Sequence, residues 1–185
     1  MKRHIILLIA FVLMSAQLFA QTPVYLTKAY KPVESDRYTA YSSLEIQGGD
    51  TWNNCFTLGV INNYHGYATF NIGGKYESIS FILGAEKSNG GNDPNIVQIH
   101  ADGKRIFDHV LRDGDLGQQF TLNISGVDKL EFSLVKPEVE AAFCEVALWT
   151  KGQTPHDLRG KKRPGGEDKN AFQGYCPLSY ERVLI

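Results

Sequence analysis

The chain is a succession of short segments in which apolar and polar residues alternate, spaced about ten residues apart and separated by Gly, Asn and Asp. Alternation with a period of two places neighbouring side chains on opposite faces of a strand, so each segment predicts a half-buried β-strand. The predicted strands cover residues 55–60, 67–72, 76–83, 96–101, 104–110, 119–124, 130–135 and 142–149. No segment shows the 3.6-residue apolar period of an amphipathic helix. Because parallel strands need long crossover connections, the pattern predicts an all-β fold, an antiparallel β-sandwich or barrel.

The connections support this fold class. Asp102-Gly103 lies between two alternating segments, which is the sequence of a tight type I′ hairpin turn. Residues 88–95 and 112–117 are rich in Gly, Asn and Asp and predict exposed loops. Residues 21–50 are mixed and polar, and we expect an edge strand there with a loop over residues 39–47. The predicted sandwich domain therefore covers residues 21–150.

The two ends of the chain differ in composition from this middle part. Residues 1–20 have two basic residues, an apolar run over residues 5–14 and a small-residue exit ending at Ala20. This is the pattern of a cleaved signal peptide, and it predicts export to the periplasm or beyond; an uncleaved membrane anchor is the alternative. The run is shorter than the ~20 residues of a membrane span. No Cys lies near Ala20, so a lipoprotein is not expected. Residues 151–185 begin as a charged, Gly/Pro-rich loop and end with an apolar segment that we expect to pack back on the sandwich.

Charge and cysteine content narrow the class of function further. The formal net charge is −1 with no long basic block, which disfavours a nucleic-acid partner. Cys55, Cys144 and Cys176 allow at most one intramolecular disulfide in an exported protein, and the pairing stays open. By strict alternation Ala142, Cys144, Val146 and Leu148 share one strand face, and a buried, unreactive thiol is the favoured interpretation of Cys144.

Three segments within residues 56–149 resemble the NPCBM-type carbohydrate-binding module. They are residues 70–81 (FNIGGKYESISF), residues 97–104 (VQIHADGK) and residues 120–132 (FTLNISGVDKLEF). The resemblance implies a jelly-roll or galactose-binding-like β-sandwich with a glycan as its partner. A Gly-x-Gly-x-His segment usual in the family is replaced here by residues 58–66, so candidate contacts must come from this chain's own loops.

Sugars bind where an aromatic ring stacks on the pyranose and planar polar side chains reach its hydroxyl groups. The densest cluster of such residue types is a single predicted turn, with Trp52 in a second patch; the candidates are Trp52, Asn62, Asn63, Tyr64, His65 and Tyr67. A strand-end turn with half-packed tyrosines is the alternative interpretation of the cluster. For Trp52 the alternative is an aromatic of the core or of a lid over it.

A structural calcium ion is a second possibility, because compact groups of side-chain oxygens suit Ca²⁺. The candidate ligands are Asn92, Asp93, Asp113, Asp115 and Glu145. Turn-capping Asn and Asp side chains and an outward-facing Glu are the competing interpretation.

No catalytic motif is present: the sequence has no GxSxG, HExxH, GxxxxGK[ST] or GxGxxG. The favoured function is an exported, non-catalytic carbohydrate-binding module without a bound cofactor. A surface or periplasmic protein-interaction module that binds another secreted protein is the main alternative. A small glycan hydrolase is the remote one, since 20 acidic residues always offer a carboxylate pair on paper.

Overall fold

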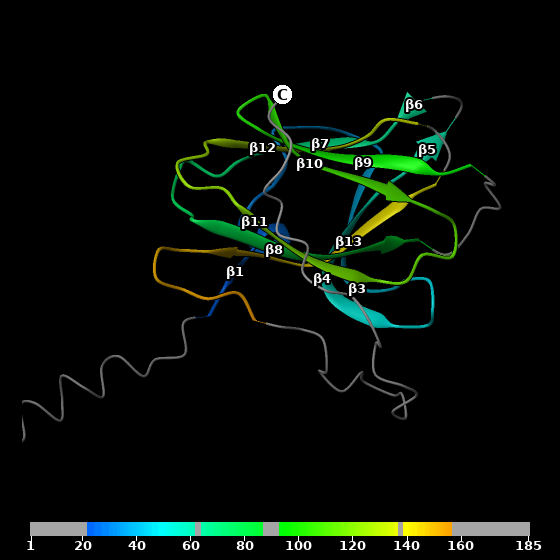
Figure 1. Ribbon diagram of the computed structural model, residues 1–185, viewed down its shortest axis with the longest axis horizontal. Helices are drawn as coiled ribbons and strands as arrows, with labels where there is room; N and C mark the ends of the chain where they lie inside the picture. Colours follow the sequence, from blue (N-terminus) through cyan, green and yellow to red (C-terminus); the bar gives the residue numbers. More distant parts are fainter. Residues whose placement is uncertain (1–21, 62–63, 87–92, 137–138, 157–185) are drawn as a thin grey trace, which may run out of the picture.

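The computed structural model describes residues 22–61, 64–86, 93–136 and 139–156. This part of the chain forms thirteen strands and one short helix (Figure 1). The elements are β1 (Val24–Tyr25), α2 (Leu26–Ala29), β2 (Glu34–Asp36), β3 (Tyr38–Glu45), β4 (Thr51–Leu58), β5 (Val60–Ile61), β6 (Tyr64–His65), β7 (Tyr67–Asn71), β8 (Ser78–Ala85), β9 (Asn95–Ala101), β10 (Lys104–Leu111), β11 (Gln118–Asn123), β12 (Lys129–Leu134) and β13 (Ala141–Trp149). Within the described ranges, no helix has the length and hydropathy required to cross a bilayer.

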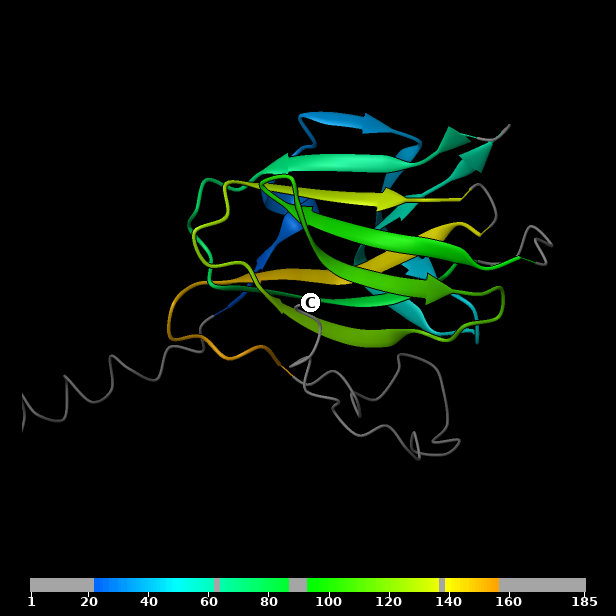
Figure 2. The same cartoon turned by 45° about the horizontal axis from the view of Figure 1, so that its top comes forward.

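Two antiparallel sheets pack face to face. Sheet A has the order β11-β8-β13-β4-β3, with β1 added beside β13, and sheet B has the order β10-β9-β12-β7-β2. Figure 1 shows sheet B above sheet A, and Figure 2 turns sheet B towards the viewer. The predicted antiparallel β-sandwich is therefore confirmed, and eight of its strands lie where alternation predicted them.

The tight turns form for the reason that their sequences suggest. Asp102 and Gly103, between β9 and β10, have φ values of 49° and 80°, as a type I′ turn requires. The Asp102 carboxylate also accepts hydrogen bonds from the backbone N–H of Asp128 at 3.2 Å and of Lys129 at 2.8 Å. This side chain thus joins the β9–β10 turn to the start of β12.

The core between the sheets is aromatic. Five fully buried phenylalanines fill its centre: Phe56, Phe70, Phe81, Phe132 and Phe143. Phe56 stacks on Phe143 with ring centroids 4.8 Å apart, and Phe132 meets Phe143 edge-on at 5.1 Å. Burying one such ring contributes about 2–3 kcal/mol, so this cluster is a large share of what holds the two sheets together.

A β-bulge in β13 overturns the prediction that its even-numbered residues share one face. Glu145 has a left-handed backbone (φ 49°), and the pairing with β8 shifts between Cys144 and Ala147. The extra residue reverses the alternation. As a result Val146 belongs to the core between the sheets, whereas Cys144 belongs to a second cluster on the outer face of sheet A.

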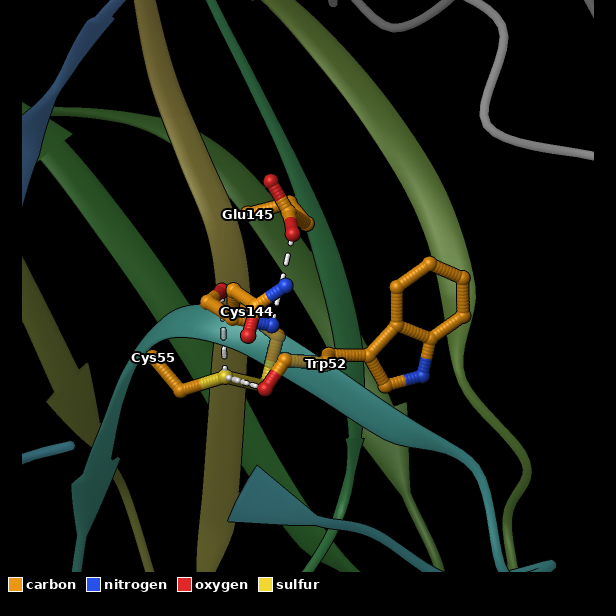
Figure 3. The surroundings of a disulfide bond; sticks show 5 residues. Trp52, Cys55, Cys144 and Glu145 are labelled. Atoms are coloured by element: carbon orange, nitrogen blue, oxygen red, sulfur yellow. Dashed lines mark hydrogen bonds between the residues drawn. A yellow bond between two sulfur atoms is a disulfide. The ribbon is translucent and has the colours of Figure 1, made fainter. Parts of the chain in front are cut away.

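The interpretation of Cys144 as an unreactive free thiol is also wrong, because Cys144 forms a disulfide with Cys55. Phe56 lies opposite Phe143 in the ladder, so the two cysteines face each other on adjacent strands β4 and β13. Both are fully buried in a cluster against which Trp52 of β4 also packs, with its indole directed away from the two sulfurs (Figure 3). The disulfide could not be predicted from the sequence, because the pairing of the two cysteines depends on the register between β4 and β13.

One further expectation needs correction, and two regions lie outside the described residues. The loop expected at residues 39–47 is mostly the edge strand β3, in which only Tyr38, Tyr41 and Leu44 are half-buried. The half-buried residues are three apart, so the strand lacks the two-residue alternation by which the other strands were predicted. The expected tail begins with a turn at residues 150–153, after which His156 packs edge-on against Trp149 at 5.0 Å. The signal-peptide region (1–20) and residues 157–185 lie outside the described residues.

Candidate functional site

The predicted aromatic and amide cluster lies at one end of the sandwich. Val60 pairs with His65 and Ile61 with Tyr64, which forms a small two-stranded hairpin, β5–β6, separate from both sheets. Figures 1 and 2 show this hairpin projecting past the ends of the strands, next to β7. The connecting residues Asn62 and Asn63 lie outside the described residues. The structure therefore places a hairpin at the predicted turn.

Backbone hydrogen bonds fix the base of the hairpin. The Gly59 N–H donates to the Arg37 carbonyl at 2.9 Å, and the Gly66 N–H donates to the Gly59 carbonyl at 3.0 Å. The Gly66 carbonyl in turn accepts from Leu134 N–H at 3.0 Å. A Cβ at Gly66 would lie 2.8 Å from the Gly59 oxygen, so a glycine is required for this close approach. The two glycines connect the hairpin to both neighbouring strands.

Tyr67 is the exposed aromatic residue at this end. It begins β7 with 36% of its surface accessible, and His65 just before it is exposed. Tyr67 lies opposite Asp36 of edge strand β2 on one side and Ser133 of β12 on the other. Directly opposed residues share a face of the sheet, so an aromatic ring is flanked by a carboxylate and a hydroxyl. This is the combination that a pyranose ring needs.

Two carboxylates lie beneath the hairpin, and their geometry bears on catalysis. Glu140 accepts a hydrogen bond from the Val60 N–H at 3.4 Å, and the Glu86 N–H donates to the Glu140 carbonyl at 3.1 Å. Burial, then a hydrogen bond to Glu140 and its negative charge, raises the pKa of Glu86 to about 7. The side chains touch, whereas glycosidase carboxyl pairs stand about 5 Å or more apart. The Glu86 and Glu140 carboxyl groups are therefore too close together for the glycosidase arrangement, and Glu140 instead holds the start of the hairpin through Val60.

Comparison with known proteins identifies the fold family. The NPCBM/NEW2 domain profile matches residues 15–153, well over half of the chain. The chain belongs to the NPCBM/NEW2 domain family. The resemblance seen in the sequence is thereby confirmed. Among curated proteins, no sequence matches the chain.

Solved carbohydrate-binding modules share the sandwich. A CBM51 module from Clostridium perfringens GH95, solved with methyl-galactose, is 13% identical with a TM-score of 0.54, over 69% of this chain and 99% of that one. Tandem CBM51 modules of Sp3GH98, a family 98 glycoside hydrolase of Streptococcus pneumoniae SP3-BS71, are 12% identical with a TM-score of 0.56, over 75% and 50%. A Clostridium perfringens ZmpB structure with an M60 catalytic domain and two CBM51 domains is 17% identical with a TM-score of 0.55, over 69% of this chain but only 15% of that one. At these identities the likeness establishes the fold.

Trp52 lies on sheet A of this NPCBM/NEW2 domain, whereas Tyr67 lies on sheet B. It is half-buried and packs against the outer cluster of sheet A that contains the disulfide (Figure 3). Its indole Nε1 is buried without a hydrogen-bond partner among the described residues. Tyr67 projects from the outer face of sheet B, on the opposite side of the sandwich. The structure therefore gives Trp52 the position of a covering aromatic and does not join it to the hairpin.

The candidate calcium ligands are spread over the domain. Asp113 and Asp115 share one turn, where the Asp115 carboxylate accepts the Arg112 N–H at 2.7 Å and Asp113 accepts from the Gln47 amide at 3.4 Å. Asp93 is exposed, and Asn92 lies outside the described residues. Glu145 is on sheet A, where it accepts the Asn53 N–H at 3.3 Å.

Glu145 also lies beside Tyr25. Burial, followed by the charge and hydrogen bond of Glu145, raises the pKa of Tyr25. Across the described ranges, no three His, Cys, Asp or Glu side chains gather as a metal site would need.

Asp36 and Ser133 were not among the residues predicted for the site. Each is an ordinary polar residue in its own segment, and only the pairing of β2, β7 and β12 brings them beside Tyr67. Alternation marks Ser133 as outward-facing. It contains no signal for which strand becomes its neighbour, so the set could not be found from the sequence.

Proposed function

We propose that this protein is an exported, non-catalytic carbohydrate-binding module whose site is centred on Tyr67 at the hairpin end of the sandwich. Family membership and the shared fold of the CBM51 modules support the class of function. The observation that carries the location is the exposed Tyr67 ring between Asp36 and Ser133. The hairpin brings His65 to the same end.

The mechanism is binding without chemistry. The Tyr67 ring would stack on the apolar face of a pyranose, while the Asp36 carboxylate and the Ser133 hydroxyl would hydrogen-bond its hydroxyl groups. His65 of the hairpin is proposed to hydrogen-bond the sugar at the same end, and the predicted contacts of Asn62, Asn63 and Tyr64 remain part of the proposal. The backbone hydrogen bonds of Gly59 and Gly66 hold the base of the hairpin next to Tyr67, which lowers the entropy lost on binding.

Isothermal titration with methyl-galactose tests this proposal, since that sugar was solved with a related module. Tyr67→Ala should weaken binding at least about fivefold, taking for the sugar the range of about 1–3 kcal/mol that stacking on an aromatic ring contributes for nucleobases. Tyr67→Phe keeps the ring and should retain most of the affinity. Tyr41→Ala, a half-buried tyrosine on the opposite face, is the matched control and should bind like the wild type.

A panel of immobilised glycans, in calcium and in EDTA, extends the test to other sugars and to the calcium hypothesis. Binding of some glycans that is lost in Tyr67→Ala and kept in Tyr41→Ala supports the proposal. If no glycan binds, or if both variants bind equally well, the proposal is wrong and the protein-interaction function takes its place. Loss of binding in EDTA would support the calcium hypothesis.

A further inference from the structure

The outer face of sheet B carries a continuous row of hydrogen-bonding side chains that begins at Tyr67. Ladder pairing sets the row: Tyr67 lies opposite Ser133, Ser133 opposite Gln98, and Gln98 opposite Asp108. On the other side Tyr67 lies opposite Asp36. Directly opposed residues of neighbouring strands share a face, so all five point away from the core. The row crosses all five strands of the sheet.

A second row runs parallel to the first, two residues along every strand except β10, where a bulge makes the step three residues. Thr69 lies opposite Glu34 and Glu131, Glu131 opposite His100, and His100 opposite Arg105. The buried residues of the same strands, such as Ala68 and Phe132, point into the core instead. The outer face is therefore polar over two complete rows.

Contacts along the rows hold several of these side chains in place. The Gln98 amide donates to the Asp108 carboxylate at 3.4 Å, and Arg105 reaches the same carboxylate at 3.2 Å. His100 Nδ1 lies 3.8 Å from Glu131 and is buried without a hydrogen bond among the described residues. Side chains that are already ordered lose less entropy when a ligand binds.

The face is open and long. Figure 2 looks onto it and shows β2, β7, β12, β9 and β10 in order, with no described helix or strand laid across them. Four strand spacings of ~4.8 Å give a row of roughly 19 Å from Asp36 to Asp108. That length suits several linked sugar rings, whereas one ring would occupy the Tyr67 end alone.

The charged side chains on the outer face of sheet B bear on whether an acidic or an uncharged glycan would bind there. Four carboxylates point outward, from Glu34, Asp36, Asp108 and Glu131. Three cations lie on or beside these rows: Arg105, which is paired with Asp108, Arg37, whose Nε lies 3.8 Å from the Asp36 carboxylate, and Lys129. The excess of carboxylates disfavours a glycan that carries its own acid groups.

We infer that sheet B binds an oligosaccharide of neutral or amino sugars, laid across the strands from Tyr67 over Ser133 to Gln98 and Asp108. This inference rests on the proposed function and adds to it the class of ligand, a chain of sugars without acid groups. Tyr67 anchors one ring at the hairpin end, and Gln98 and Asp108 hydrogen-bond rings farther along the chain.

Titration with a chain-length series tests the inference, using methyl-galactose and β-linked galactotetraose. The tetraose should bind at least about tenfold more tightly than the monosaccharide if it makes two or more further hydrogen bonds. Gln98→Ala should weaken tetraose binding about three- to tenfold and leave methyl-galactose binding unchanged. Gln118→Ala, at an exposed glutamine on sheet A, is the matched control and should change neither.

Three tetraoses of equal length separate the effect of charge: galactotetraose, tetragalacturonate and the glucosamine tetramer. The acidic chain should bind least tightly, and its disadvantage should shrink in high salt. Glu34→Gln with Glu131→Gln should reduce that disadvantage.

The outcomes distinguish the inference from the proposed function. The inference is wrong and the proposed function stands in either of two cases. In the first, methyl-galactose binds through Tyr67 but the tetraose binds no more tightly than methyl-galactose. In the second, Gln98→Ala binds the tetraose with the wild-type affinity. Tightest binding of tetragalacturonate would likewise overturn the inference. If no sugar binds in any arm, both are wrong.

Discussion

Removal of the Cys55–Cys144 disulfide should lower the stability of the sandwich by several kcal/mol. The bond joins residues 89 positions apart in the sequence. In the chain-entropy model, breaking a disulfide that closes a loop of that length lowers the free energy of unfolding by about 4.6 kcal/mol. Both sulfurs are fully buried, so truncation to alanine adds a packing loss of about 1 kcal/mol. Because measured effects often fall short of this model, we expect a total of about 3–5 kcal/mol.

The perturbation is the double variant Cys55→Ala/Cys144→Ala, which leaves no buried thiol without its partner. Urea unfolding followed by circular dichroism should show a lower midpoint with little change in slope, and the thermal midpoint should fall by roughly 8–15 °C. The wild type in reductant should move towards the variant. Cys176→Ser is the matched control and should behave like the oxidised wild type. A double variant within about 1 kcal/mol of the wild type would refute the reasoning.

Three further outcomes follow from contacts elsewhere in the fold. Because the folded state raises the pKa of Glu86 from 4.5 to about 7, it holds that proton more tightly than the unfolded chain. The free energy of unfolding should therefore fall by roughly 1–2 kcal/mol, after solvent screening, as the pH rises through this window, and Glu86→Gln should remove that fall in pH-dependent urea titrations. Asn95→Ala should cost about 2–4 kcal/mol in urea unfolding, since its buried amide accepts from Ile96 and Lys136 N–H and donates to the Val139 carbonyl. Gly66→Ala should cost about 1–3 kcal/mol and weaken glycan binding by titration, because the new Cβ displaces the hairpin.

Strand positions could be predicted from the sequence because each depends on local chemistry. Alternation sets which residues face inward, and turns such as Asp102-Gly103 need particular residues at particular φ angles. An edge strand was predicted within residues 21–50, but β3 lies where a loop was expected, because packing on one side alone leaves little apolar pattern. Local patterns thus find central strands more easily than edge strands.

The features that escaped prediction depend on register. The bulge at Glu145 reverses the faces of β13, and nothing in the residues around it requires a left-handed backbone there. The disulfide follows from that register, since it needs Cys144 opposite Cys55 on the outer face. The same limit applies to the candidate site: Tyr67 was identifiable as an aromatic near a turn, whereas its neighbour Asp36 comes from pairing with β2.

The two outer faces of the sandwich differ in a way that separates stability from binding. On sheet A the outer face carries an apolar cluster that contains the disulfide, Ile82 and Ala142, with Trp52 packed against it. On sheet B the outer face is polar and is reached by no described element. A ligand on sheet B contacts none of the groups that the disulfide orders. The Cys55→Ala/Cys144→Ala variant should therefore bind glycans with the wild-type affinity at any temperature where it is folded. A weaker glycan affinity in the folded variant would contradict this expectation. It would mean that removing the disulfide on sheet A changes the binding face of sheet B through the core.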